Sequence, residues 1–135
     1  MFSVRSVNDP LIVPTSFSSF ERVFGSKFAD TITGTGVAEV FFGEGGNDDL
    51  LGNGGNDKLF GGDGNDFIDA QQGNDVVFLG AGNDLFQWDP GDGSDTIEGQ
   101  DGNDTMLFNG SGGAEIFEAS ANGARVRFTR NLGTI

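Results

Sequence analysis

The sequence predicts an all-β fold in which many short strands stack as successive turns of a solenoid. Three observations carry that prediction: a nine-residue repeat, one apolar residue at a fixed place in each unit, and 24 glycines against 3 prolines. A single unit cannot bury its apolar residue alone, so the units must stack to form a core. Abundant glycine without proline is typical of a chain that turns tightly and often.

The 135-residue chain is long enough for one domain, and its formal net charge is −14. Such acidity disfavours nucleic acid and anionic membranes as partners and favours cations. No stretch approaches the roughly 18 apolar residues of a membrane span, and the N-terminus lacks the pattern of a secretory signal peptide. The chain contains neither His nor Cys, which removes the commonest general base and nucleophile, so we expect no enzymatic activity.

The repeat is weak from Gly25 and becomes regular at Gly43, where the units read GEGGNDDLL, GNGGNDKLF, GGDGNDFID, AQQGNDVVF and LGAGNDLFQ. An eleven-residue unit, WDPGDGSDTIE, and a last nonapeptide, GQDGNDTML, complete the series. Two residues after the acidic sixth position, every unit has an apolar residue. The acids at position six are Asp30, Glu39, Asp48, Asp57, Asp66, Asp75, Asp84, Asp95 and Asp104.

Each position of the unit has a physical reason. Glycines, and the asparagines at position five, tolerate left-handed backbone, which lets the first six residues turn tightly. Aspartate at position six supplies a hard oxygen ligand of the kind that Ca²⁺ prefers, and turn carbonyls can supply more. The last three residues have the pattern of a minimal strand with one side chain pointing inward. The repeat therefore predicts calcium ligands in the turns of the stacked units.

The pattern resembles the repeats-in-toxin (RTX), or hemolysin-type, calcium-binding nonapeptides, and Gly61–Asp69 fits every position of that motif. The resemblance covers Gly25 to about Leu107. It implies a right-handed parallel β-roll of two sheets, in which two units make one coil. It also implies that calcium lies between the turns of units i and i+2, and that the protein is secreted by bacteria through type I secretion.

Carried onto this chain, the resemblance places calcium ligands on the two sides of the roll and predicts about six Ca²⁺ ions. The first side uses Asp30, Asp48, Asp66, Asp84 and Asp104. The second uses Asp57, Asp75 and Asp95, preceded by Glu39, whose side chain is longer than that of the aspartates. The turn residues expected at these sites are Gly43, Gly45, Asn47, Gly52, Gly54, Asn56, Gly61, Asp63, Asn65, Gly99, Asp101 and Asn103.

The flanks are expected to cap the roll, which divides the chain into residues 1–24, 25–107 and 108–135. Ser16–Gly25 is predicted to form a short helix, because Ser18 and Glu21 have the spacing of a capping box. Asn122-Gly123 is a hairpin signal between two strand-like segments. A strand-like pattern reaches Ile135, so we expect the chain to be a fragment of a longer protein.

The sequence thus predicts a calcium-binding module that folds when its ions bind. Two alternatives stay open on the same roll. One is recognition of an acidic polysaccharide, a polyuronate, for which only Arg125–Arg130 offers a basic patch. The other concerns an outer ladder of aromatic rings at position nine, formed by Phe42, Phe60 and Phe78. Such an apolar stripe is expected to be covered by the N-terminal Phe17/Phe20/Phe24 segment or the terminal hairpin, by self-association of two rolls, or by a foreign partner.

Overall fold

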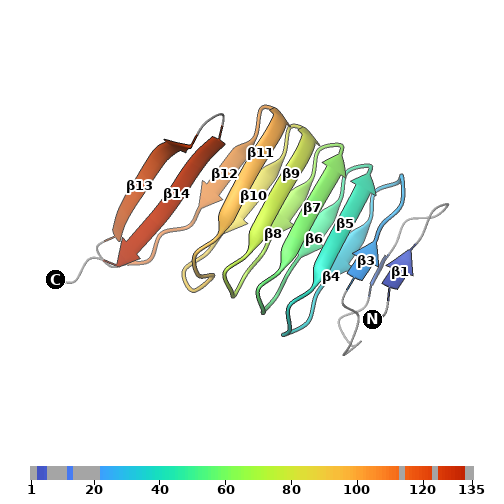
Figure 1. Cartoon of the computed structure of the whole chain (residues 1–135), viewed down its shortest axis with the longest axis horizontal. Coiled ribbons are helices and arrows are strands. Elements are labelled where there is room, and N and C mark those ends of the chain that lie inside the picture. The colour runs from blue at the N-terminus through green and yellow to red at the C-terminus, as the bar shows by residue number, and fades with distance from the viewer. Residues whose placement is uncertain (1–2, 6–11, 14–21, 113–114, 123–124, 133–135) are drawn as a thin grey trace.

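The computed structural model describes residues 3–5, 12–13, 22–112, 115–122 and 125–132. Within these ranges every regular element is a strand, and none is a helix that could cross a membrane. Two six-stranded parallel sheets lie face to face (Figure 1). The first sheet has the order β1 (Ser3–Arg5), β3 (Arg22–Phe24), β5 (Val40–Gly45), β7 (Lys58–Asp63), β9 (Val76–Gly82) and β11 (Thr96–Gly102).

The second sheet faces the first, and its strands follow one another along the roll in the same way. Consecutive strands alternate between the sheets, so the chain coils through one strand of each sheet per turn. Phe41 therefore pairs with Leu59, and Leu59 with Val77, at intervals of two nonapeptides. The predicted two-sheet parallel solenoid is confirmed. The order of the second sheet is β12 (Thr105–Phe108), β10 (Leu85–Trp88), β8 (Phe67–Asp69), β6 (Asp49–Leu51), β4 (Thr31–Thr33) and β2 (Ile12–Val13).

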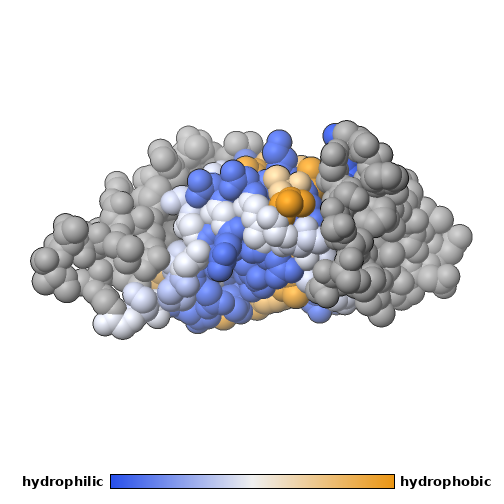
Figure 2. All heavy atoms as spheres, turned by 90° about the horizontal axis from the view of Figure 1, so that it is seen from below, coloured by the Kyte–Doolittle hydropathy of each residue, from blue (hydrophilic) through white to orange (hydrophobic). Residues whose placement is uncertain are grey.

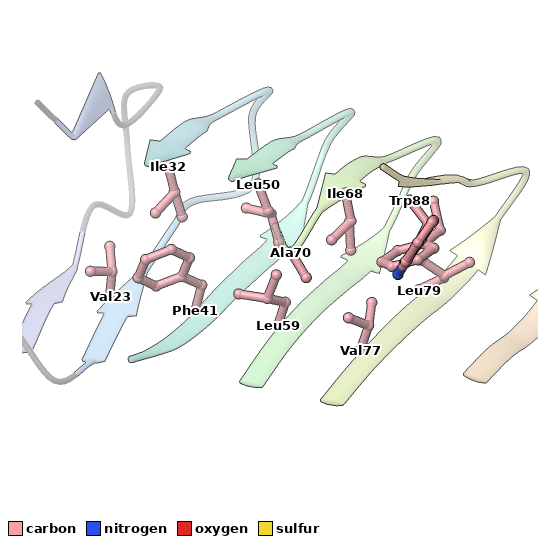
Figure 3. Close-up of a cluster of buried hydrophobic side chains, with 11 residues drawn as sticks. Val23, Ile32, Phe41, Leu50, Leu59, Ile68, Ala70, Val77, Leu79 and Trp88 are labelled. Carbon is pink, nitrogen blue, oxygen red and sulfur yellow. The ribbon is translucent and has the colours of Figure 1, made fainter. Parts of the chain in front are cut away.

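The core is a narrow row of side chains between the two sheets (Figure 3). Position eight of each regular unit points inward, as predicted from the alternation of side chains along a strand. Position one also points inward, which the sequence analysis did not anticipate. Where position one is not glycine, its side chain joins the core, as Ala70, Leu79 and Trp88 do. The fully buried residues at the inward strand position are Val23, Ile32, Phe41, Leu50, Leu59, Ile68, Val77 and Phe86.

The predicted helix over Ser16–Gly25 is wrong in the part that the structure describes. Arg22–Phe24 form β3, which pairs in parallel with β1 on one side and β5 on the other. Val23 fills the inward position of that strand and is fully buried. An open edge of a sheet offers a row of backbone hydrogen-bonding groups, and pairing there outweighs the weak local signal for a helix. Residues 16–21 of the predicted helix lie outside the described residues.

A separate pair of strands follows the roll. β13 (Glu115–Asn122) pairs antiparallel with β14 (Arg125–Leu132), from Glu115 opposite Leu132 to Asn122 opposite Arg125. This strand pairing agrees with the hairpin expected around Asn122-Gly123, and its role as a cap stays a prediction. At this end of the roll Met106, in the inward position of β12, is still 36% exposed.

Candidate metal centre

The acidic residues at position six align in two columns, each at one side of the roll, where a turn leads into a strand. Within a column the backbone N–H of one acid donates to Oδ1 of the acid one coil further on. Asp48 donates to Asp66 at 2.8 Å, and Asp66 donates to Asp84 at 2.8 Å. The first column consists of Asp30, Asp48, Asp66, Asp84 and Asp104, and the second of Glu39, Asp57, Asp75 and Asp95.

The eleven-residue unit does not interrupt these columns. The N–H of Asp75 donates to Asp95 Oδ1 at 3.0 Å, and the N–H of Asp84 donates to Asp104 Oδ1 at 3.2 Å. Both pairs are 20 residues apart, whereas the other pairs are 18 apart. The two extra residues are therefore taken up within the turn, and Asp95 keeps its place, as the sequence analysis expected.

The second oxygen of most of these carboxylates is buried without a hydrogen-bond partner. A buried charge without a partner is strongly unfavourable, because it has lost its hydration and gained nothing in exchange. A cation that accepts these oxygens as ligands removes that penalty. The oxygens concerned are Oδ2 of Asp48, Asp57, Asp66, Asp75, Asp84 and Asp95.

Glycine at position one makes room for these oxygens. A Cβ atom added to Gly61 would collide with Asp66 Oδ2 of the same unit and with the carbonyl oxygen of Leu79 in the next coil. The same holds at Gly43, where the obstacles are Asp48 Oδ2 and the carbonyl oxygen of Gly61. One aspartate oxygen and one carbonyl oxygen therefore face the same small space. A carboxylate oxygen and a carbonyl oxygen meet in the same way at Gly25, Gly34 and Gly52, whereas a Cβ on Gly99 would meet only the carboxylate of Asp104.

The turns reach their tight shape at positions two and four rather than at position five. Gly46 and Gly64, at position four, have φ values of 110° and 139°. Position two is left-handed even where it is not glycine, as at Glu44, with φ 78°, and Gln71, with φ 63°. Left-handed backbone brings successive turns into close contact, since a Cβ on Gly64 would meet the carbonyl oxygen of Gly46.

The asparagines at position five do not use the left-handed conformation that the sequence analysis gave as their reason. Instead they form a hydrogen-bonded ladder on the outside of the turns. The backbone N–H of Asn65 donates to Asn47 Oδ1 at 2.9 Å, and that of Asn83 donates to Asn65 Oδ1 at 2.9 Å. On the other side the N–H of Asn74 donates to Asn56 Oδ1 at 2.9 Å. These side-chain oxygens bind neighbouring turns together and are already engaged.

The predicted turn residues at position three lie at the surface of the roll. The carbonyl oxygen of Asp63 accepts from the N–H of Gly46 at 2.8 Å, while its carboxylate is exposed. Asp101 is likewise exposed. Gly45 and Gly54 donate backbone hydrogen bonds to the preceding coil, to Ser26 and Thr35 respectively, each at 3.0 Å. Seen edge-on, a row of turns is mostly hydrophilic, with hydrophobic residues along its borders (Figure 2).

The two acids at the N-terminal end are held by hydroxyl groups at position two. Ser26 donates to Asp30 through both its N–H and its hydroxyl. Thr35 does the same for Glu39, with its N–H and its hydroxyl each 2.8 Å from a carboxylate oxygen. These hydroxyls were not recognised from the sequence, although Ser or Thr two residues into a weak unit is the signal. The first turn of each column therefore depends least on a cation.

Burial changes the acidity of the aspartates in the columns. Burial raises the pKa of Asp48, Asp57 and Asp95 to about 7, against an ordinary value of 3.8. The hydrogen bond from the preceding acid's N–H lowers each pKa in part, and neighbouring carboxylates raise it again. The same causes raise the pKa of Asp66 and Asp75 to about 6. The ionised form needs a partner that the protein itself does not supply.

In the part of the chain that the structure describes, no three carboxylates converge on one point. A cation between two turns would therefore take one or two aspartate oxygens and complete its shell with main-chain carbonyl oxygens and water. Ca²⁺ accepts 6–8 oxygen ligands in flexible geometry, whereas Mg²⁺ demands a near-ideal octahedron. The donor set fits Ca²⁺ and, without nitrogen or sulfur, does not fit the metals that prefer those ligands.

Calcium binding is expected to weaken on acidification, because Ca²⁺ and protons compete for the same carboxylates. With pKa values near 7 for Asp48 and Asp57, the apparent affinity at about pH 5.5 should be at least about 10-fold below that at about pH 8. Calorimetric titrations at fixed ionic strength would measure this, and equal affinities would contradict it. Without calcium the dependence has the opposite sign. A raised carboxyl pKa means that the folded roll loses stability as pH rises from about 4 to about 7.

Comparison with protein-family models finds four copies of the RTX calcium-binding nonapeptide repeat, over residues 17–50, 24–59, 51–86 and 91–111. These matches cover more than half of the chain and follow the coils of both sheets. No curated protein matches the chain.

Proposed function

Because the chain belongs to the family of RTX calcium-binding nonapeptide repeats, we propose that its calcium-binding β-roll forms only when the ions are bound. The observation that carries this proposal is the set of six buried Oδ2 atoms without a hydrogen-bond partner in the two columns. Such oxygens oppose folding unless a cation accepts them. Binding that requires the folded site then contributes its free energy to folding.

About six Ca²⁺ ions are expected per chain. Residues 30–109 contain 17 acidic residues and one basic residue, Lys58, which gives a net charge of 1 − 17 = −16. Six divalent ions would offset most of that charge. The number of position-six aspartate oxygens without a hydrogen-bond partner is also six, equal to the expected number of ions. Calorimetric titration with Ca²⁺ tests the stoichiometry, and a chain that binds no calcium would refute the proposed function.

Folding on calcium suits a protein that leaves a bacterial cell through type I secretion. The chain would stay unfolded where calcium is scarce and would fold outside, where calcium is plentiful. The support for this step is the family to which the repeats belong. The proposed role is that of a binding and folding module rather than an enzyme.

A second candidate function is self-association, and it is favoured by a stack of aromatic rings on the outer face of the first sheet. The predicted stacking of Phe42, Phe60 and Phe78 is confirmed, with centroid distances of 4.8 and 5.0 Å and ring planes within 7° of parallel. Phe24 of β3 extends the stack, 4.6 Å from Phe42. The four rings are half-buried. Recognition of a polyuronate through Arg125–Arg130, on β14, stays a prediction without such an observation.

Phe60→Ser is expected to convert a calcium-bound dimer into a monomer, because it interrupts the middle of this apolar stack. Sedimentation velocity in saturating calcium would measure the change. Phe67→Ser is the matched control, since Phe67 is a half-buried ring on the outer face of the second sheet, in β8, and is not part of the stack. Identical sedimentation of the wild type and Phe60→Ser would exclude self-association through this face.

A further inference from the structure

Two carboxylates outside the columns, those of Asp69 and Asp92, are buried, although the residues at equivalent positions of other units are half-buried or exposed. Asp69, at position nine, is 8% exposed, although Gln87 at the same position of β10 is half-buried. Asp92 stands in the turn of the eleven-residue unit and is 6% exposed. At the equivalent place in other turns, Asp63 and Asp101 are exposed. The eleven-residue unit therefore creates a setting that no other unit of the roll has.

The extra residues of that unit form a turn that is hydrogen-bonded to the preceding coil. Trp88 enters the core, and the chain then reverses, with the N–H of Asp92 donating to the carbonyl oxygen of Asp89 at 3.1 Å. The N–H of Asp89 donates in return to Asp92 Oδ2. The carbonyl oxygen of Asp92 accepts from the N–H of Gly73 at 2.7 Å, which fixes this turn to the preceding coil.

Asp89 itself is well supplied with hydrogen bonds. Gln87 Nε2 donates to Asp89 Oδ2 at 2.8 Å, and Asn109 Nδ2 donates to Asp89 Oδ1 at 2.6 Å. Asp69 lies opposite Gln87 in the register of the sheet. The side-chain amide of Gln87 thus donates to Asp89.

Asp69 Oδ1 is buried and has no hydrogen-bond partner. Burial raises the pKa of this carboxyl, the charges of Asp92 and Asp89 raise it further, and hydrogen bonding to the side chain and backbone of Gln71 lowers it in part. Asp92 therefore acts on Asp69 as a charge of the same sign. Among the described residues, no Lys or Arg forms an ion pair with either carboxylate. Two buried like charges side by side require either a cation or a shared proton.

We propose that Asp69 and Asp92 bind one further calcium ion at the eleven-residue unit, outside the two columns of position-six acids. The partnerless, nine-tenths buried Oδ1 of Asp69 is the ligand that points to it. No third carboxylate converges here, so carbonyl oxygens of the turn and water complete the shell, as Ca²⁺ allows. The inference rests on the proposed function, because the roll must first fold around the calcium ions that the two columns of position-six acids bind.

The test is to count the calcium bound to the folded chain by equilibrium dialysis and elemental analysis. The variant Asp69→Asn/Asp92→Asn keeps the shape of both side chains and removes their charge, and it should bind one ion fewer than the wild type. The matched control is Asp63→Asn/Asp101→Asn, which removes two exposed charges from equivalent turns and should bind as many ions as the wild type.

A second comparison separates this site from the neighbouring column. Asp95→Asn should lose its own column ion, and adding Asp69→Asn to it should lose one more. If Asp69→Asn/Asp92→Asn binds as many calcium ions as the wild type, the proposal is overturned, and a proton shared by the two carboxylates would account for their burial instead. Failure of the added Asp69→Asn to remove a further ion would also overturn it. A wild type that binds no calcium would instead refute the proposed function.

Discussion

Removing calcium with a chelator is expected to unfold the repeat region, and restoring it is expected to return a β-rich far-UV circular dichroism spectrum. The reason is that each strand contributes only one or two side chains to the core, and burial of a large apolar side chain stabilises the fold by about 1.5–3 kcal/mol. Ordering the backbone opposes folding by about 1–2 kcal/mol per residue. Six buried carboxylate oxygens without partners add to that opposition.

The control for this experiment is Mg²⁺ at the same ionic strength. Mg²⁺ screens the charge of the chain equally, but its octahedral shell does not suit turns of main-chain oxygens. It should therefore restore little or no structure. A spectrum that is the same in chelator and in calcium would show that the roll does not depend on its ions.

Asp66→Ala is expected to have the largest effect of any single substitution in the columns. Asp66 Oδ1 accepts the N–H of Asp48 at 2.8 Å, and its Oδ2 faces the cradle at Gly61. Its removal leaves a buried N–H without a partner, at about 1–3 kcal/mol. It also takes a ligand from two adjacent interturn sites. The calcium concentration at the folding midpoint should rise by at least about 10-fold.

Asp30→Ala provides the matched comparison, because Asp30 occupies the same position at the end of the same column. Its carboxylate is already held by Ser26, and it borders only one interturn site. The shift of its folding midpoint should therefore be clearly smaller. Titrations of both variants followed by circular dichroism would decide this. Equal effects of Asp66→Ala and Asp30→Ala would show that the columns do not act as calcium ligands in this order.

Much of the fold could be predicted from local spacing. A nine-residue period with one acid and one apolar residue at constant phase determines which residues align when the units stack. Together with the resemblance to RTX repeats, which implies two units per coil, it predicted that Asp48, Asp66 and Asp84 would share one side and that Phe42, Phe60 and Phe78 would stack at 18-residue intervals. These features repeat in every coil, so a single register accounts for all of them.

The features that were missed depend on neighbours in adjacent coils. Arg22–Phe24 has a helix-like signal by itself, but pairing with β5 makes it a strand. The asparagines at position five bond to the next asparagine 18 residues away, which no local propensity describes.

The sequence by itself determined the period, the phase of the acids and apolar residues, and hence the stacking of the units, and its resemblance to RTX repeats implied the parallel roll. Only the tertiary structure decided which carboxylates are satisfied. It satisfied Asp30 through Ser26, left Asp66 Oδ2 without a partner, and buried both Asp69 and Asp92. The physical reason is that burial and hydrogen bonding arise when one coil is laid on the next, whereas the repeat pattern is complete within a single unit.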